Sequence, residues 1–271
     1  MILFTPIFLY YFGYNYYLIA TEKFLKKNDA NSIYFAIKKS KKTTNKKKII
    51  ISDSMGGQLF PVSKKYDSIY TLSTTAPASL VGSYILIKNL LKRNNLKGRT
   101  IYYIAHPTSL SYDLREPHTY NHFIKPFFLS DNYKYISSTA DSLLRFWPFL
   151  HAAQLPFVKT TNWQPEFEFK KDDRIQISKL YLEYFKKIIL LSKEEKFDFF
   201  VLMPFLQEKE KNESYLKIKE QVAQHKLDNI FSKYFEKTPF LASKFFIEND
   251  MHYNSKNLNL IDEKLLFQLL N

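Results

Sequence analysis

Cysteine is absent from this chain of 271 residues, and glycine is scarce, with five residues in all. The absence of cysteine excludes disulfide bridges, thiolate metal sites and cysteine nucleophiles. No Gly-Lys-Ser/Thr sequence occurs, which excludes a P-loop. Two of the five glycines nevertheless stand side by side, Gly56 and Gly57, directly behind a serine. Such a concentration in a glycine-poor chain indicates a special backbone requirement at this place.

Acidic residues are in deficit, and the excess of positive charge favours certain partners. Lys and Arg total 40 against 26 Asp and Glu, so the net charge is +14. This charge favours an anionic neighbour, such as an anionic membrane surface or an acidic polymer. Nucleic acid is the weaker interpretation, because the lysines are scattered and only residues 38 to 48 form a basic run.

The N-terminal segment lacks charge altogether, since residues 1 to 21 carry no ionisable side chain other than tyrosine. About 20 apolar residues span a bilayer, and Tyr suits the interface. No small-residue cleavage site follows, so the segment predicts an uncleaved membrane anchor helix over residues 1 to 27. A buried N-terminal helix is the alternative. The lysines behind the segment favour a cytoplasmic body by the positive-inside rule: Lys23, Lys26 and Lys27.

Short apolar runs alternate with helical patterns along the rest of the chain. Strands are predicted at residues 48 to 52, 67 to 73, 99 to 107 and 197 to 204, with a short last strand within 243 to 254. Helices are predicted at residues 76 to 94, 172 to 196, 212 to 226 and 258 to 270, after a first short helix that ends in the basic run. The alternation predicts an α/β domain over residues 28 to 271 with a mostly parallel sheet and an aromatic-rich insertion at about 113 to 172.

Residues with catalytic chemistry follow three of these strands, at the sheet edge where functional groups gather. Ser54 follows the first strand, and the glycines behind it leave room for backbone N–H groups to approach. Near the other end of the chain, Asp250 precedes His252 by two residues, so its carboxylate can orient the ring while His252 takes the serine's proton. The alternative is that the serine or its neighbours cap the next helix, and Asp53 is expected to be a cap or turn residue.

The same blocks resemble a known family. The Gly-Asp-Ser block of the SGNH (GDSL-like) hydrolases is similar to "IIISDSMGGQL" at residues 49 to 59. The closing Asp-x-His-Trp/Tyr block of the envelope O-acetylation branch, which includes alginate O-acetylation proteins, is similar to "ENDMHYNSKNLNL" at residues 248 to 260. The resemblance covers about residues 46 to 110 and 175 to 270, in the family's order. It implies a three-layer α/β/α sandwich of the SGNH or flavodoxin-like kind.

The resemblance also implies the roles of the residues in these blocks. Ser54 would be the nucleophile, His252 the general base and Asp250 the group that orients His252. If instead the more widespread Asp-x-x-His spacing applied, Asn249 would stand in the acid's place, which would impair the triad. The family's chemistry would be that of a serine esterase or O-acyltransferase, which moves an acyl group, with acetyl expected, through an acyl-serine intermediate.

The implied partners are an envelope glycan or other acyl-ester substrate, a membrane protein that donates the acyl group, and the anionic membrane surface. The resemblance places the body of a membrane-anchored protein outside the cytoplasm, against the direction that the lysines behind the anchor favour. No cofactor is expected. No metal is expected either, because four histidines lack ligand spacing with carboxylates: His118, His122, His151 and His225.

The sequence departs from the family pattern at the groups that stabilise an oxyanion. Ser52 replaces the glycine of the first block, and Thr75 or Ala76 stands where the second block has a glycine. His106 stands about where the third block has an asparagine, and a satisfied structural histidine is the alternative there. The candidate donors are therefore Gly56, Thr75, Ala76 and His106.

A missing oxyanion donor costs roughly 10²- to 10³-fold in rate. An inactive SGNH-like scaffold or glycan-binding partner in an envelope assembly is therefore an alternative function. A third possible function is that of a basic binding protein in which Ser54 and His252 never meet.

Overall fold

The computed structural model describes residues 31–116, 118–128, 132–147, 150, 175–208, 214–236, 240–247 and 251–270. The predicted anchor over residues 1 to 27 lies outside these ranges. Within them, none of the helices combines the length and apolar character that a bilayer crossing requires.

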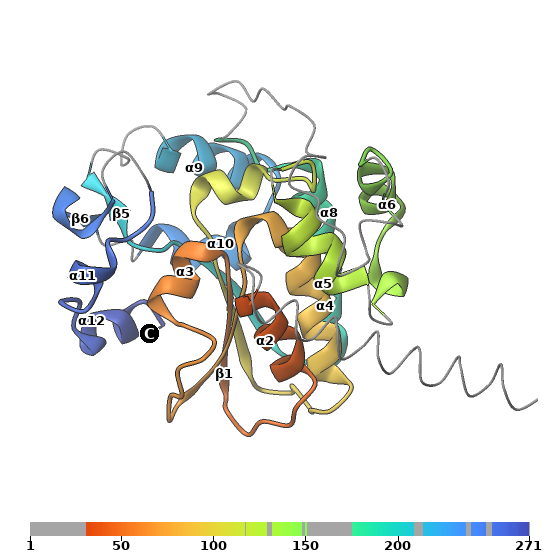
Figure 1. Ribbon diagram of the computed structural model, residues 1–271, viewed down its shortest axis with the longest axis horizontal. Coiled ribbons are helices and arrows are strands. Elements are labelled where there is room, and N and C mark those ends of the chain that lie inside the picture. Colours follow the sequence, from red (N-terminus) through yellow and green to blue (C-terminus); the bar gives the residue numbers. More distant parts are fainter. Residues whose placement is uncertain are drawn as a thin grey trace, which may run out of the picture.

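A four-stranded parallel sheet forms the centre of the molecule (Figure 1). Its strands are β1 (Lys48–Ser52), β2 (Ile69–Ser73), β3 (Thr100–Ile104) and β4 (Asp198–Leu202), in the spatial order β2-β1-β3-β4. All pairs are parallel and in register, so the four strands end at one edge. The four predicted strands and the parallel α/β class are thereby confirmed. The first strand has the predicted bounds, whereas the other three are shorter because the prediction included their flanking residues.

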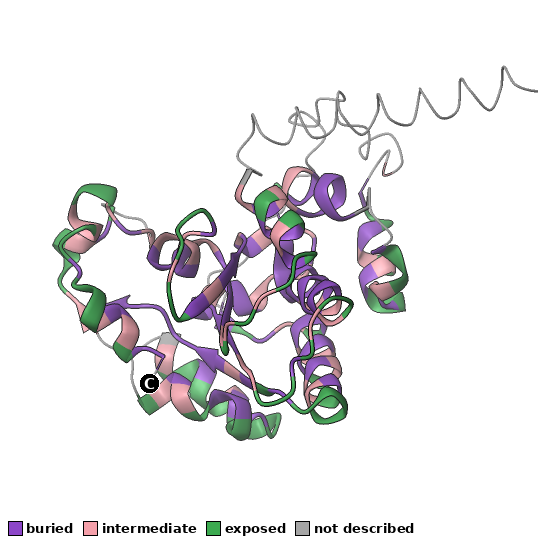
Figure 2. Cartoon of the chain, turned by 90° about the horizontal axis from the view of Figure 1, so that it is seen from below, coloured by how far each residue is buried: buried purple, intermediate pink, exposed green. Residues whose placement is uncertain are grey.

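Alternate side chains of the strands pack into two cores on opposite faces of the sheet. Ile49 and Ile51 face the larger core, with α2 (Asn31–Ser40), α4 (Ser79–Leu91) and α8 (Lys179–Glu195). Ile50 and Tyr102 face the smaller core, with α3 (Ser54–Leu59) and α12 (Glu263–Gln268). Figure 1 shows α4 and α8 on one side of the sheet and α12 on the other. In Figure 2 the strands and the inward sides of the helices are buried.

The other helices of the described residues include α10 (Asp228–Glu236), which packs against β4. The rest are α5 (Lys125–Phe128), α6 (Ser138–Leu144), α9 (Ser214–Gln224) and α11 (Ser255–Leu258), with the 3₁₀ helices η1 (Ala76–Ala78), η2 (Pro107–Ser111), η4 (Tyr133–Tyr135) and η7 (Ser243–Phe245) and the π-helical turn η3 (Tyr120–Ile124). The predicted helix 76 to 94 is η1 followed by α4, and the predicted helix 258 to 270 is reduced to α12.

A short last strand was predicted within residues 243 to 254. In the described part of this segment, residues 243–247 and 251–254, no strand joins the central sheet, and Phe246 and Tyr253 form an isolated antiparallel bridge. A separate two-stranded pair is formed by β5 (Leu206–Gln207) and β6 (Phe240–Leu241). The apolar run around Phe246 packs into the smaller core without joining the central sheet, which is why its strand-like pattern misled the prediction.

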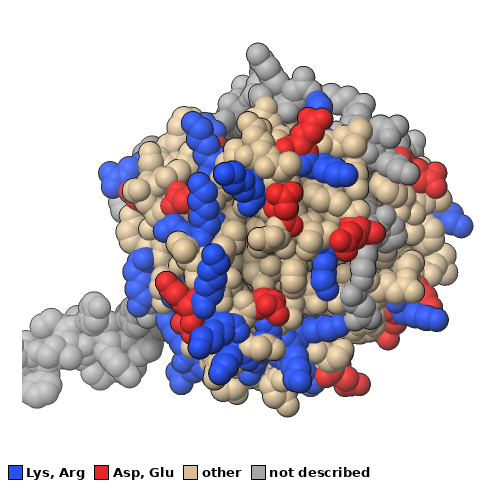
Figure 3. Space-filling view, turned by 180° about the vertical axis from the view of Figure 1, so that it is seen from behind, with Lys and Arg blue, Asp and Glu red and all other residues tan. Residues whose placement is uncertain are grey.

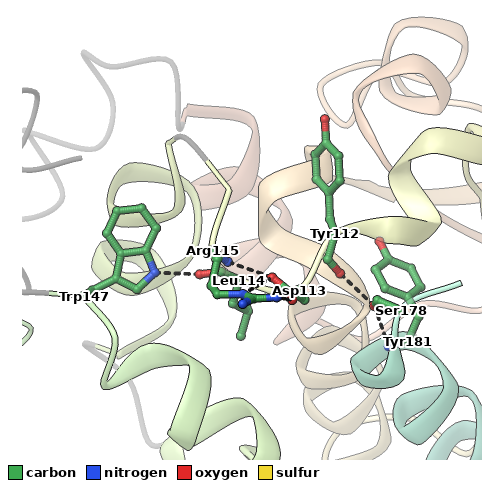
Figure 4. A network of polar contacts seen from close by, with 7 residues as sticks. All are labelled: Tyr112, Asp113, Leu114, Arg115, Trp147, Ser178 and Tyr181. Carbon is green, nitrogen blue, oxygen red and sulfur yellow. Dashed lines mark hydrogen bonds and ion pairs between the residues drawn. The ribbon is translucent and has the colours of Figure 1, made fainter. Parts of the chain in front are cut away.

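The residue just before the predicted insertion, Tyr112, is tied to the start of α8 (Figure 4). Ser178 caps that helix by accepting from the Tyr181 N–H, and its hydroxyl donates to the Tyr112 carbonyl at 3.1 Å. Trp147 donates from its ring N–H to the Leu114 carbonyl at 2.6 Å. The described part of the insertion adds buried aromatic side chains to the larger core: Tyr120, Phe123, Phe127 and Trp147.

Candidate active site

The turn from β1 into α3 places Ser54 at the carboxyl edge of the sheet. β1 ends at Ser52, and α3 begins only two residues later, at Ser54 itself. The residue between them is the cap, because Asp53 Oδ1 accepts the Gly56 N–H at 3.1 Å. The expectation that Asp53 is a cap is therefore confirmed. Ser54 does not cap the helix, and its half-buried side chain is directed elsewhere.

Asp53 also joins the ends of two neighbouring strands. Its side chain is 1% exposed, and its Oδ2 accepts from the His106 N–H and from the Ser109 hydroxyl, both at 2.7 Å. Its own N–H donates to the Ile104 carbonyl at 3.0 Å. Buried carboxylates are retained where donors surround them in this way. The turn that holds Ser54 is therefore fixed to β3 as well as to β1.

Ser54 meets His252 across 198 residues of sequence. The Ser54 Oγ lies 2.9 Å from the His252 Nε2, a normal hydrogen-bond distance. This is the contact that a serine needs if a histidine is to take its proton. It excludes the interpretation in which the two residues never meet. The predicted acid, Asp250, lies outside the described residues, as does its alternative Asn249.

Gln58, on the same helix as Ser54, holds the segment that carries His252. Its Nε2 donates to the Tyr253 carbonyl and its Oε1 accepts the Tyr253 N–H, both at 3.1 Å. The buried Tyr253 in turn donates from its hydroxyl to the Phe205 carbonyl at 2.8 Å. Sequence reasoning missed Gln58. The available signal was its position four residues after Ser54, which puts both side chains on one face of a helix.

Gly56 does not provide space around Ser54, and the expectation that its N–H is an oxyanion donor is wrong. That N–H already donates to Asp53. A Cβ added at Gly56 would lie 2.4 Å from the Ser52 Cβ and 2.9 Å from the Ile104 Cβ. The glycine is needed because α3 crosses very close to β1 and β3. A Cβ added at Gly57 would make only ordinary contacts, the nearest at 3.5 Å.

A hollow of about 330 Å³ opens beside Ser54. Its lining is neutral throughout and comes from four short pieces of chain, with these residues: Ser32, Phe35, Ser54, Gly57, Gln58, Pro61, Val62, Ser63, Ser73, Thr74 and Thr75. Such a lining suits a small uncharged group better than an ionised one, because a charge in this hollow would have no opposite charge on its walls.

The other candidate oxyanion donors differ in whether their polar groups already have hydrogen-bond partners. His106 caps η2, where its Nδ1 accepts the Thr108 N–H at 3.3 Å and lies 2.8 Å from the Thr108 hydroxyl, as a structural histidine would. Thr75 lines the hollow beside Ser54, and its buried hydroxyl finds no hydrogen-bond partner in the described part of the chain. Ala76 is buried at the start of η1. Among these three residues, Thr75 is thus the one whose side chain carries a polar group without a hydrogen-bond partner in the described residues.

Among the described residues, no group of three or more His, Cys, Asp and Glu side chains is placed to hold a metal ion. Comparisons with protein-family models, with curated proteins and with solved structures give no match for this chain.

Proposed function

We propose that the protein is an SGNH-type serine esterase or O-acyltransferase that forms an acyl-Ser54 intermediate. The observation that carries the proposal is the 2.9 Å contact between the Ser54 hydroxyl and the His252 ring. The two side chains come from opposite ends of the described chain and meet at the carboxyl edge of a parallel sheet, where α/β enzymes hold their active sites. The SGNH or flavodoxin-like version of the fold belongs to the same proposal.

The first half of the reaction acylates the serine. Ser54 Oγ attacks the ester carbonyl carbon while its proton passes to His252 Nε2, which gives a tetrahedral oxyanion. The oxyanion collapses by breaking the bond to the alcohol oxygen, and that oxygen takes the proton from His252. Asp250 is proposed to hold the His252 ring and to stabilise its positive charge between the two proton transfers.

The second half of the reaction regenerates the serine. A water or a sugar hydroxyl gives its proton to His252 Nε2 as its oxygen attacks the acyl carbon, and the second tetrahedral intermediate releases Ser54, which recovers the proton. Water as acceptor makes the protein an esterase, and a sugar hydroxyl makes it an O-acyltransferase.

Thr75 is the proposed source of oxyanion stabilisation. Donors that already point at the site of charge development cost little reorganisation during the reaction. The Thr75 hydroxyl is buried, lines the same hollow as Ser54 and has no partner among the described residues. It is proposed to replace the asparagine and glycine donors of the family pattern, in place of Gly56, Ala76 and His106.

The neutral hollow supports a short uncharged acyl group, and acetyl is the proposed one. An envelope glycan is the proposed carrier of the ester, with a membrane protein as the donor of the acyl group in the transferase case. A membrane-anchored location outside the cytoplasm, near anionic lipid, completes the proposal. The uncharged stretch of residues 1 to 21 supports the anchor, and the net charge of +14 supports the nearness to anionic lipid. The side of the membrane rests on the resemblance alone.

A catalytically inactive scaffold is the second candidate function, and one observation favours it. Two of the four expected oxyanion donors, Gly56 and His106, are engaged in capping contacts. A scaffold of this kind would bind the glycan through the same hollow without turnover.

Covalent labelling of the serine tests the proposed function. A serine-reactive phosphonate is expected to add one group to the full-length protein, on the peptide that contains Ser54, with parallel loss of p-nitrophenyl acetate hydrolysis. Ser63→Ala, an exposed serine of the same hollow, serves as control and is expected to label normally. Labelling that persists in Ser54→Ala would rule out the nucleophile, and a wild type with neither labelling nor turnover would favour the scaffold.

Gln58→Ala is expected to lower kcat/KM for p-nitrophenyl acetate by about 10- to 100-fold, because a misplacement of roughly 1 Å at a catalytic group has that effect. The substitution removes both hydrogen bonds that hold Tyr253, the neighbour of His252. Gln221→Ala is the matched control. Gln221 clamps the 175–177 segment in the same way, accepting the Ile177 N–H and donating to the Ile175 carbonyl.

Both glutamine variants are expected to lose similar stability in urea unfolding, whereas only Gln58→Ala should lose activity. Equal activity in the two variants would show that Gln58 does not position His252.

A further inference from the structure

A second, larger hollow lies on the amino-terminal side of the sheet, next to the loops that lead into its strands. It measures about 810 Å³, and five of its lining residues are basic whereas one is acidic, Asp67. The basic residues are Lys39, Lys46, Lys64, Lys65 and Arg99. Figure 3 shows Lys and Arg side chains gathered at the lower end of the molecule, where these loops lie in Figure 1.

The basic hollow continues the line of the neutral hollow beside Ser54. Along α2, Ser32 and Phe35 line the neutral hollow and Lys39 lines the basic one, a spacing of three and four residues that keeps all three on one stripe of the helix. Seven residues of helix rise by roughly 10 Å. Along the facing segment, residues 61–63 line the first hollow and residues 64–67 line the second.

Lys39 stands between the two hollows. Its Nζ donates to the Val62 carbonyl at 3.1 Å and to the Thr71 hydroxyl at 3.2 Å. Burial, with a smaller contribution from Lys42, lowers the pKa of its ammonium group, so a negative charge nearby would favour the protonated form. The contacts fix this cation at the boundary, where a ligand that extends from one hollow to the other would pass it.

The walls of the basic hollow carry groups that suit a hydroxylated anionic ligand. Tyr66 lines it, and the buried Tyr66 hydroxyl has no partner within the described ranges. Arg99 is held in place because its guanidinium donates to the Thr44 carbonyl at 2.8 Å. Lys64 and Lys65 are exposed, and the Lys64 Nζ lies 2.8 Å from the Glu263 carboxylate, which partly neutralises its charge. Lys65 therefore contributes more positive charge to the hollow than Lys64 does.

We propose that the two hollows form one binding track for an anionic glycan, with the ester-bearing sugar at Ser54 and a carboxylate or phosphate group of the same chain in the basic hollow. The position of the ester rests on the proposed function, whereas the binding of the anionic chain does not. The track selects acidic polymers because the neutral hollow accepts the acyl group while the adjacent cations hold the charge of a neighbouring unit.

Binding is tested on the full chain with Ser54→Ala, so that turnover plays no part. The probes are fluorescently labelled oligogalacturonate, which carries carboxylates, and a labelled oligomer of glycerol phosphate. The test variant adds Lys64→Gln and Lys65→Gln. The matched control adds Lys186→Gln and Lys187→Gln on α8, which remove the same charge and likewise break one Lys–Glu pair, Lys187 with Glu183. Neither control residue lines the neutral hollow or the basic hollow.

The test variant is expected to weaken binding of at least one probe by about fivefold, and the control by less than twofold. Raising the salt concentration is expected to reduce the difference in probe affinity between the test variant and the control. The preferred probe identifies the anionic group as carboxylate or phosphate.

Three results would overturn the proposal: equal weakening in test and control, binding of neither probe, or tighter binding of phosphatidylglycerol vesicles or single-stranded DNA than of both probes. Hydrolysis of p-nitrophenyl acetate by the chain with Ser54 intact is scored separately. The binding experiment therefore tests the track, and the hydrolysis assay tests the proposed function, so that either can fail without the other.

Discussion

His252→Ala is expected to lower kcat for p-nitrophenyl acetate hydrolysis by on the order of 10⁴-fold or more, as loss of the general base does in serine hydrolases. The reason is the 2.9 Å contact between the His252 Nε2 and the Ser54 hydroxyl. Without the ring, no group is in place to take the serine's proton during attack or to return a proton to the leaving alcohol. The effect should fall on kcat, because the neutral hollow that binds the acyl group is unchanged.

The control for this substitution is His225→Ala, which removes an exposed histidine just beyond α9. It is expected to leave kcat within about twofold of the wild type, as exposed positions away from special features usually do. Far-UV circular dichroism of both variants checks that each is folded. A His252→Ala protein that is folded and retains a tenth or more of the wild-type kcat would refute the assignment of His252 as base.

Asp53→Ala is expected to lower the free energy of unfolding by about 3 kcal/mol or more. The substitution leaves three buried donors without their acceptor: the Gly56 N–H, the His106 N–H and the Ser109 hydroxyl. Each buried group left unsatisfied costs about 1–3 kcal/mol, with some relief where water can enter. Urea unfolding followed by circular dichroism measures the loss.

Asp262→Ala is the matched control, because Asp262 also caps a helix through its side chain, accepting the Lys264 N–H at 3.0 Å, but is exposed. Loss of such a cap costs about 1 kcal/mol. If the two aspartate variants lose equal stability, Asp53 acts as a cap alone and does not join β1 to the segment after β3.

Local patterns in the sequence were sufficient to predict the central sheet. β1 is three consecutive isoleucines behind a lysine, and the polar turn that follows leaves little choice of where it ends. The helix over residues 179–195 also has a strong apolar stripe, which predicted it well apart from its start. The start was predicted too early, because Ile177, just before the capping residue Ser178, has the spacing of the helix's apolar stripe.

The sequence indicated which side chains meet, but not what holds them. Ser54 and His252 were predictable, because the ends of parallel strands share an edge and the order of the blocks resembles a known family. Gln58 was missed because its hydrogen bonds go to backbone atoms of Tyr253, which leave no pattern in the side chains, so that its place four residues after Ser54 was the available signal. The role of Gly56 was misjudged because it depends on how close a helix passes to a strand.

The close approach between Ser52 and Gly56 constrains the order in which this turn can change. With Ser52 in place, a methyl group at position 56 would need to share space with the Ser52 Cβ, so a change at 56 alone overpacks the turn. A change of Ser52 to glycine removes one of the two neighbours that crowd that position. The effects of substitutions at the two sites on stability are therefore coupled rather than additive. During evolution, a residue larger than glycine at position 56 would be tolerated better if Ser52 had first been replaced by glycine.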